Sequence, residues 1–97
     1  VKSGRVTNLI PDGTSTTLTG NWVYKDAPKS ALQVVASAAA TVVFEVSNDG
    51  TNAVATLLGT VTLAAAGSDG FTTDAPWKYI RAVVTANSGT VNVTMSV

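Results

Sequence analysis

Hydrophobic and polar residues alternate along the last part of the chain. From Thr90 to Val97 every second residue is valine or methionine, and the residues between them are threonine, asparagine or serine. This period of two predicts a β-strand with one face in a core and the other in water. Residues 77–86 alternate in the same way, and residues 87–89 (Asn-Ser-Gly) favour a turn, so the two segments predict a hairpin. The inner face of the first strand is expected to consist of Ile80, Ala82, Val84 and Ala86.

The same alternation recurs earlier in the chain, most clearly in residues 40–47, where Phe44 lies on the expected inner face. Segments rich in Gly, Pro, Asn and Asp separate the apolar stretches, among them residues 48–50 (Asn-Asp-Gly) and 67–70 (Gly-Ser-Asp-Gly). Short strands punctuated in this way predict an all-β chain: a single-domain antiparallel β-sandwich over residues 1–97 with about seven or eight strands. Further strands are expected at residues 14–18, 21–24, 31–37, 57–64 and 71–73.

The beginning of the chain is the exception to this alternation. Residues 1–10 show no regular period, and we expect them to form an extended N-terminal arm that becomes ordered on a neighbouring subunit. No apolar stretch approaches the roughly 20 residues that a membrane-spanning helix needs.

The charge balance narrows the choice of partners. Only 12% of the 97 residues are charged, and six basic and six acidic residues cancel to a net charge of zero. Nucleic acids and anionic membranes are bound through clusters of basic residues, and no such run occurs, so neither is expected as a partner. Nothing in the net charge opposes self-association, which favours a protein that works within an assembly.

The side chains that catalysis usually requires are missing. The sequence contains no histidine and no cysteine, which removes the commonest general base at neutral pH and the usual ligands of zinc. Asp69 and Asp74 are the best candidates for a pair of catalytic carboxylates. Each precedes turn-forming residues, however, and both are interpreted as turn residues. Residues 48–52 lack the glutamate that would complete a calcium loop. We therefore expect no enzyme activity, no catalytic residue, no metal site and no cofactor.

Aromatic residues provide the best candidates for binding. Trp77, Tyr79 and Arg81 alternate with the Ile80 face and are expected to point outward, and Trp, Tyr and Arg are the residues that protein interfaces prefer. We predict that these three anchor an interface, with Trp22 and Tyr24 as the next candidates. Two alternatives remain open at this point: the aromatic rings form the edge of the core of this same domain, or they stack on sugar rings.

Four segments in the second half of the chain form a recognisable set: residues 44–52 (FEVSNDGTN), 58–61 (LGTV), 74–82 (DAPWKYIRA) and 89–93 (GTVNV). Together they resemble small virion structural proteins of tailed bacteriophages, of the capsid decoration or cement type. In such proteins a V-S-N-D-G hairpin, a buried strand, an aromatic strand ending in Arg-Ala and a final Thr/Val strand recur.

This resemblance implies a β-sandwich, often of jelly-roll topology, on the exterior of a viral capsid. The implied partners are the major capsid protein and further copies of the chain, as a homodimer or a homotrimer. The implied role is to stabilise the shell by binding across capsid subunits. A tail- or fibre-associated module that binds a receptor or a carbohydrate is the alternative, and an accessory domain of a larger enzyme is the third.

Overall fold

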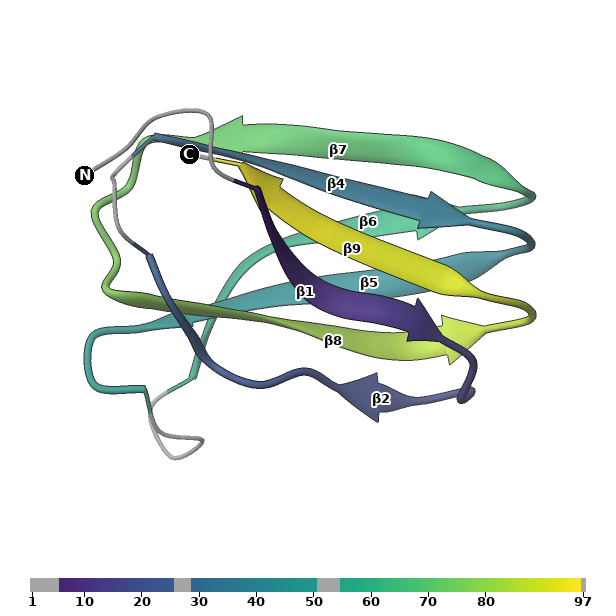
Figure 1. Cartoon of the computed structure of the whole chain (residues 1–97), viewed down its shortest axis with the longest axis horizontal. Coiled ribbons are helices and arrows are strands. Elements are labelled where there is room, and N and C mark those ends of the chain that lie inside the picture. The colour runs from purple at the N-terminus through teal and green to yellow at the C-terminus, as the bar shows by residue number, and fades with distance from the viewer. Residues whose placement is uncertain (1–5, 26–28, 51–54, 97) are drawn as a thin grey trace.

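A computed structural model describes residues 6–25, 29–50 and 55–96, and in this part of the chain it contains strands and no helix. Figure 1 shows two antiparallel sheets that lie face to face. The predicted all-β sandwich is therefore confirmed. The strands are β1 (Val6–Gly13), β2 (Leu18–Thr19), β3 (Val23–Tyr24), β4 (Ser30–Ala36), β5 (Ala40–Ser47), β6 (Thr56–Leu63), β7 (Gly67–Thr73), β8 (Tyr79–Asn87) and β9 (Val91–Ser96).

The strand order is that of a jelly roll. One sheet has the order β1-β9-β4-β7, and the other has the order β2-β8-β5-β6, with β3 also paired to β8. Because β2 and β3 pair with successive parts of β8, they act as one interrupted edge strand. The pairs β1–β9, β2/β3–β8, β4–β7 and β5–β6 are then nested around the β5–β6 connection, as in a long hairpin rolled into two layers.

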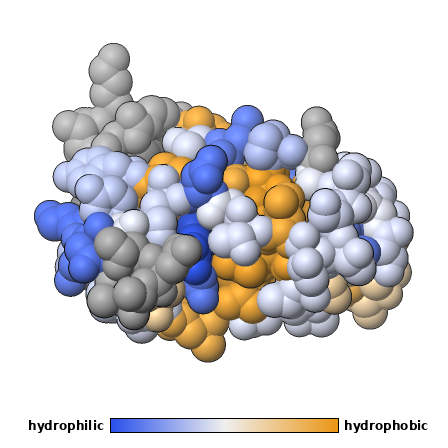
Figure 2. Space-filling model, turned by 90° about the horizontal axis from the view of Figure 1, so that it is seen from below, coloured by the Kyte–Doolittle hydropathy of each residue, from blue (hydrophilic) through white to orange (hydrophobic). Residues whose placement is uncertain are grey.

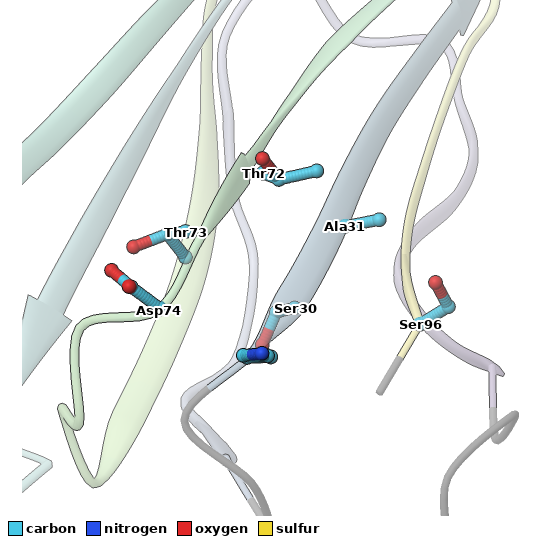
Figure 3. Close-up of a pocket in the computed structure, with 7 residues that line it drawn as sticks. Ser30, Ala31, Thr72, Thr73, Asp74 and Ser96 are labelled. Atoms are coloured by element: carbon cyan, nitrogen blue, oxygen red, sulfur yellow. The ribbon is translucent and has the colours of Figure 1, made fainter.

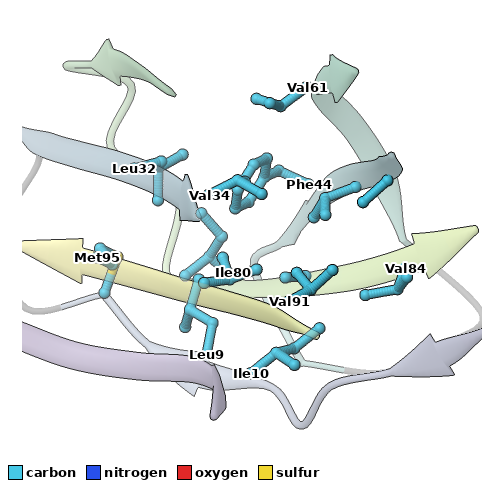
Figure 4. Packing of buried hydrophobic residues seen from close by; sticks show 14 of the residues in the cluster. Leu9, Ile10, Leu32, Val34, Phe44, Val61, Ile80, Val84, Val91 and Met95 are labelled. Atoms are coloured by element: carbon cyan, nitrogen blue, oxygen red, sulfur yellow. The ribbon is translucent and has the colours of Figure 1, made fainter. Parts of the chain in front are cut away.

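The core lies between the two sheets and follows the predicted alternation. In β4 the residues Leu32, Val34 and Ala36 are buried and their neighbours in sequence are exposed. Figure 4 shows side chains from both sheets meeting in this layer, with Phe44 near its centre. The Phe44 ring meets the Phe71 ring edge-on, with 5.4 Å between ring centres. Full burial of each large apolar side chain contributes roughly 1.5–3 kcal/mol, so this layer is the main source of stability.

Two β-bulges change which residues face the core. Opposite β5 the register of β8 skips Thr85, so that Ala86 is exposed and Asn87 is buried. The prediction that Ala86 lies on the inner face was therefore wrong, because the extra residue reverses the alternation after it. In β6 the register skips Leu58, which packs against the core, and Leu57 is displaced to the outer face, where it is 64% exposed.

The strand β7 was predicted in part only. Residues 67–70 were interpreted as a turn, but they pair with β4 in an unbroken register, and the turn lies at residues 64–66. This strand requires glycine at position 70, because a side chain there would collide with the carbonyl oxygen of Leu32.

The first strand corrects the expected N-terminal arm. Residues 6–10 belong to β1, which pairs with β9, and Leu9 and Ile10 are both buried in the core. The register shifts between Asn8 and Ile10 and again before Gly13, so the strand has no period of two to recognise. Residues 1–5 lie outside the described residues.

Candidate functional site

The predicted aromatic and arginine residues come together where β3 runs beside β8. The edge formed by β2 and β3 contains one extra residue, because Thr19 lies opposite Val83 whereas Val23 lies opposite Ile80. Gly20 begins this bulge and donates its N–H to the carbonyl of Ala82, at 2.8 Å. The bulge contains Trp22 and brings its ring over β8.

Arg81 lies beneath the Trp22 ring. The guanidinium carbon is 4.6 Å from the ring centre, a cation–π contact, and the Nε and Nη2 atoms both donate to Oε1 of Glu45, each at 2.7 Å. Glu45 stands directly opposite Arg81 on β5, which fixes this pairing. Arg81 is only 9% exposed, so its charge is engaged within the chain and a partner would meet the surrounding aromatic rings first.

Two tyrosines form the outer part of the cluster. The rings of Tyr24 and Tyr79 meet edge-on, with 5.7 Å between their centres and an angle of 71° between their planes. Tyr24 is 53% exposed, whereas Tyr79 is half-buried. Behind Tyr79 lies Gly50, whose φ of +70° suits glycine, and a side chain there would press on the tyrosine ring. The hydroxyl of Ser47 holds this loop by accepting the N–H groups of Asp49 and Gly50, each at 3.1 Å.

Trp77 does not belong to this outward cluster. It precedes β8, is half-buried and packs against the core, which agrees with the alternative that places an aromatic ring at the edge of the core. Trp77 and Tyr79 were predicted to share one face because the strand was expected to begin at residue 77, two residues before β8 begins.

Lys25, which no motif in the sequence marks, anchors the other side of the cluster. Its side chain is buried, and its Nζ donates to the carbonyl oxygen of Ala75 at 2.9 Å. This contact ties the end of β3 to the segment before β8. Burial lowers the pKa of Lys25, and the nearby carboxylate of Asp74 opposes that shift. No local signal in the sequence distinguishes this lysine from a solvated one.

The outer face of the β8–β5–β6 sheet extends the cluster with apolar groups. Val43 lies between Val83 and Thr60, and both valines are half-buried. Leu57, beside Glu45, adds an exposed aliphatic side chain. From below the view of Figure 1, at the edge of the sandwich where β2 lies, hydrophobic residues gather over the middle of the molecule, with hydrophilic residues beside them (Figure 2). We call the set Trp22, Tyr24, Val43, Leu57, Tyr79 and Val83 the aromatic–aliphatic face.

A shallow depression of about 560 Å³ lies at one end of the other sheet (Figure 3). Four of its seven lining residues are serine or threonine, although most of the exposed lining surface is apolar. The hydroxyl of Ser30, one of the four, is buried and has no hydrogen-bond partner among the described residues. The described residues contain no group of three or more Asp, Glu, His or Cys side chains placed to hold a metal ion. The residues that line the depression are Lys29, Ser30, Ala31, Thr72, Thr73, Asp74 and Ser96.

No helix in the described part of the chain is long and apolar enough to cross a membrane. No family model matches the sequence, and no curated protein sequence is similar to it. Among solved structures, the chain is similar to the PBSX exported protein XepA, with a TM-score of 0.65 and 17% sequence identity over 99% of this chain. The chain spans 38% of the length of that protein. This likeness concerns the fold alone, which a solved structure also has.

Proposed function

We propose that this chain is a non-catalytic structural protein of a phage particle and that it binds a virion subunit through the aromatic–aliphatic face. Within that class, the finer assignment is a capsid decoration protein on the capsid exterior, which binds across neighbouring subunits of the major capsid protein.

The observation that carries this proposal is the composition of the aromatic–aliphatic face. Tyr24 and Leu57 are 53% and 64% exposed. The one ion pair on this face, Arg81 with Glu45, is satisfied within the chain. A partner therefore meets aromatic and aliphatic groups on a support that is already ordered. This chain consequently loses little side-chain entropy on binding.

Two further points support the proposal. The structural neighbour XepA is phage-related, and a jelly roll is a common fold of viral capsid proteins. The balanced charge and the missing catalytic side chains agree with a role in binding rather than in chemistry.

Co-sedimentation with capsid shells that lack decoration proteins tests the proposal. The unmodified protein is expected to pellet with the shells and to saturate at a fixed number of copies per capsid subunit. Leu57→Ser and Tyr24→Ala are expected to weaken binding at least about tenfold, as truncation of buried interface anchors does. Val35→Ser is the matched control, because Val35 is 43% exposed on the outer face of the opposite sheet.

Three outcomes contradict the proposal. The protein fails to bind any shell or tail component, or Val35→Ser weakens binding as much as Leu57→Ser does, or a purified glycan competes for the binding.

The last outcome would favour the second candidate function, a receptor- or carbohydrate-binding module. The depression in Figure 3 is the observation in its favour, since Thr72, Thr73 and Ser96 are among its lining residues and hydroxyl groups both donate to and accept from sugars. Glycan titration followed by NMR would then place the shifts at Thr72 and Ser96, away from Tyr24.

A further inference from the structure

The four edges of the two sheets differ in how they are protected. Unpaired backbone groups at a sheet edge can pair with another chain, and proteins usually prevent this with bulges, prolines or charged side chains. Edge strand β1 contains two register shifts and Pro11. The β2/β3 edge is interrupted by the bulge at residues 20–22, and β6 is bulged at Leu58.

Edge strand β7 has no bulge and no proline, and the carboxylate of its one charged residue accepts the N–H of Gly70 at 2.8 Å. Its seven residues pair with β4 from Gly67 to Thr73 without a register shift. It ends the strand order of its sheet, and among the described residues no strand pairs with its outer side (Figure 1). Its only charged residue is Asp69, and the residues of the strand that share the outer sheet face, Ser68, Gly70 and Thr72, are small and exposed.

We propose that β7 is a self-pairing edge, at which the β7 strands of two copies join antiparallel and form one continuous sheet across a two-fold axis. A second copy is the partner that fits, because the strand is complementary to itself. With the axis at Gly70, all seven residues overlap and each Ser68 lies opposite Thr72 of the other copy, a cross-strand hydroxyl pair that stabilises sheets.

The charges agree with this register. Each Asp69 then lies opposite Phe71 of the other copy, so the two carboxylates are diagonal rather than directly opposed, and the zero net charge adds no repulsion between the copies. Gly70 leaves the centre of the joint without a side chain on either copy, and its N–H, which Asp69 Oδ1 accepts at 2.8 Å within the chain, exchanges that acceptor for the other copy. The inference goes beyond the proposed function and does not depend on it, since β7 lies in the other sheet from the aromatic–aliphatic face.

One strand pair buries less than a standard interface, so the dimer in solution is weak. On a particle, however, copies that are already held close together pair at a high effective concentration. The joint would thus link neighbouring copies laterally while another surface contacts the shell.

Sedimentation equilibrium of the purified chain, up to about 1 mM because small interfaces give weak association, tests the inference. The unmodified protein is expected to show a reversible monomer–dimer equilibrium. The double variant Ser68→Lys/Thr72→Lys places like charges opposite each other twice and is expected to weaken dimerisation about tenfold or more. Its control, Val35→Lys/Ala31→Lys, carries the same charges on the exposed residues directly opposite in β4 and is expected to dimerise like the unmodified protein.

A third variant tests the register itself. In Ser68→Lys/Thr72→Asp each lysine faces an aspartate of the other copy, so dimerisation is expected to be stronger than in the unmodified protein. Circular dichroism confirms in each case that the fold is retained. A protein that is monomeric at every concentration, a double-lysine variant that dimerises normally, or a Lys/Asp variant that dimerises more weakly would each overturn the inference. Leu57→Ser is expected to leave the dimer unchanged, which separates this result from failure of capsid binding.

Discussion

Arg81 contacts two different groups at once: its guanidinium lies 4.6 Å from the centre of the Trp22 ring and is paired with Glu45 at 2.7 Å. The arginine therefore links three strand segments on one sheet face. Because the guanidinium is largely removed from water, the two contacts are worth more than they would be on an open surface.

Removal of the Glu45 carboxylate is expected to show how strongly the stability of the fold depends on its pairing with Arg81. Glu45→Gln should lower the free energy of unfolding by about 1–3 kcal/mol, since the largely buried arginine loses its charged acceptor. The double variant Glu45→Gln/Arg81→Met should be more stable than the sum of the single changes implies, because replacing both partners leaves no uncompensated charge. Urea denaturation measures all four proteins, and strictly additive losses would contradict a coupled pair.

The stability of the fold is expected to depend on both the shape and the charge of the side chain at Asn87. Its amide donates to the carbonyls of Gly13 and Ser15, at 3.2 and 3.1 Å, and accepts the N–H of Gly89 at 2.9 Å. Asn87→Ala should cost about 1–3 kcal/mol, because these groups lose their partners. Asn87→Asp should cost more at neutral pH, where a carboxylate would face two carbonyl oxygens.

The pH dependence of Asn87→Asp provides the check. Repulsion raises the pKa of the introduced carboxyl above its usual value of about 3.9. The variant should therefore regain stability as the pH falls through that raised pKa, whereas the stability gap between Asn87→Ala and the unmodified protein stays nearly constant. A gap for Asn87→Asp that does not change with pH would refute this explanation.

Lys25 is expected to affect stability at alkaline pH. Its pKa is lowered in the folded chain, mainly by burial, so the unfolded chain binds the proton more tightly. The burial cost of the charge is fully present below the folded-state pKa and disappears as the pH rises toward the unfolded value of 10.5. The difference in unfolding free energy between the unmodified protein and Lys25→Met should therefore move in favour of the unmodified protein between neutral pH and pH 10. A difference that falls over this range would show that the attraction of Asp74, not burial, has the larger effect on the pKa of Lys25.

Gly70 allows a test of the close approach between β7 and β4. Gly70→Ala should be destabilising at the upper end of the roughly 1–3 kcal/mol that overpacking costs, because the added carbon meets the carbonyl of Leu32. Ser68→Ala, two residues away on the same face, should change stability by less than about 0.5 kcal/mol, as surface substitutions usually do. Equal effects from the two substitutions would refute the steric argument.

The sequence predicted the strands that contain no bulge residue of their own. In β4 and β9 the alternation is unbroken, in β5 it holds as far as Val46, and the buried hydrophobic residues were those expected. It failed at Ala86, since the bulge at Thr85 depends on pairing with β5, a strand far away in the sequence, and leaves no local pattern. Gly70 was taken for a turn residue because a close approach to Leu32 is a tertiary property.

The candidate site was predictable in composition but not in arrangement. Tyr24, Tyr79, Arg81 and Trp22 were chosen by residue type, and the structure brings these four together. The contact between Trp22 and Arg81 depends on one extra residue in the β2/β3 edge, which no periodicity reveals. Leu57 was missed because no sequence pattern reveals the bulge at Leu58 that turns it to the outer face.

The pairing of Val6 with Ser96 has a consequence for how the chain folds. The first strand cannot find its place until the last one has left the ribosome, so the complete sandwich forms only once residues 91–96 are available. The β5–β6 hairpin, which needs only the middle of the chain, is able to form earlier and to serve as the nucleus around which the outer strand pairs assemble in turn.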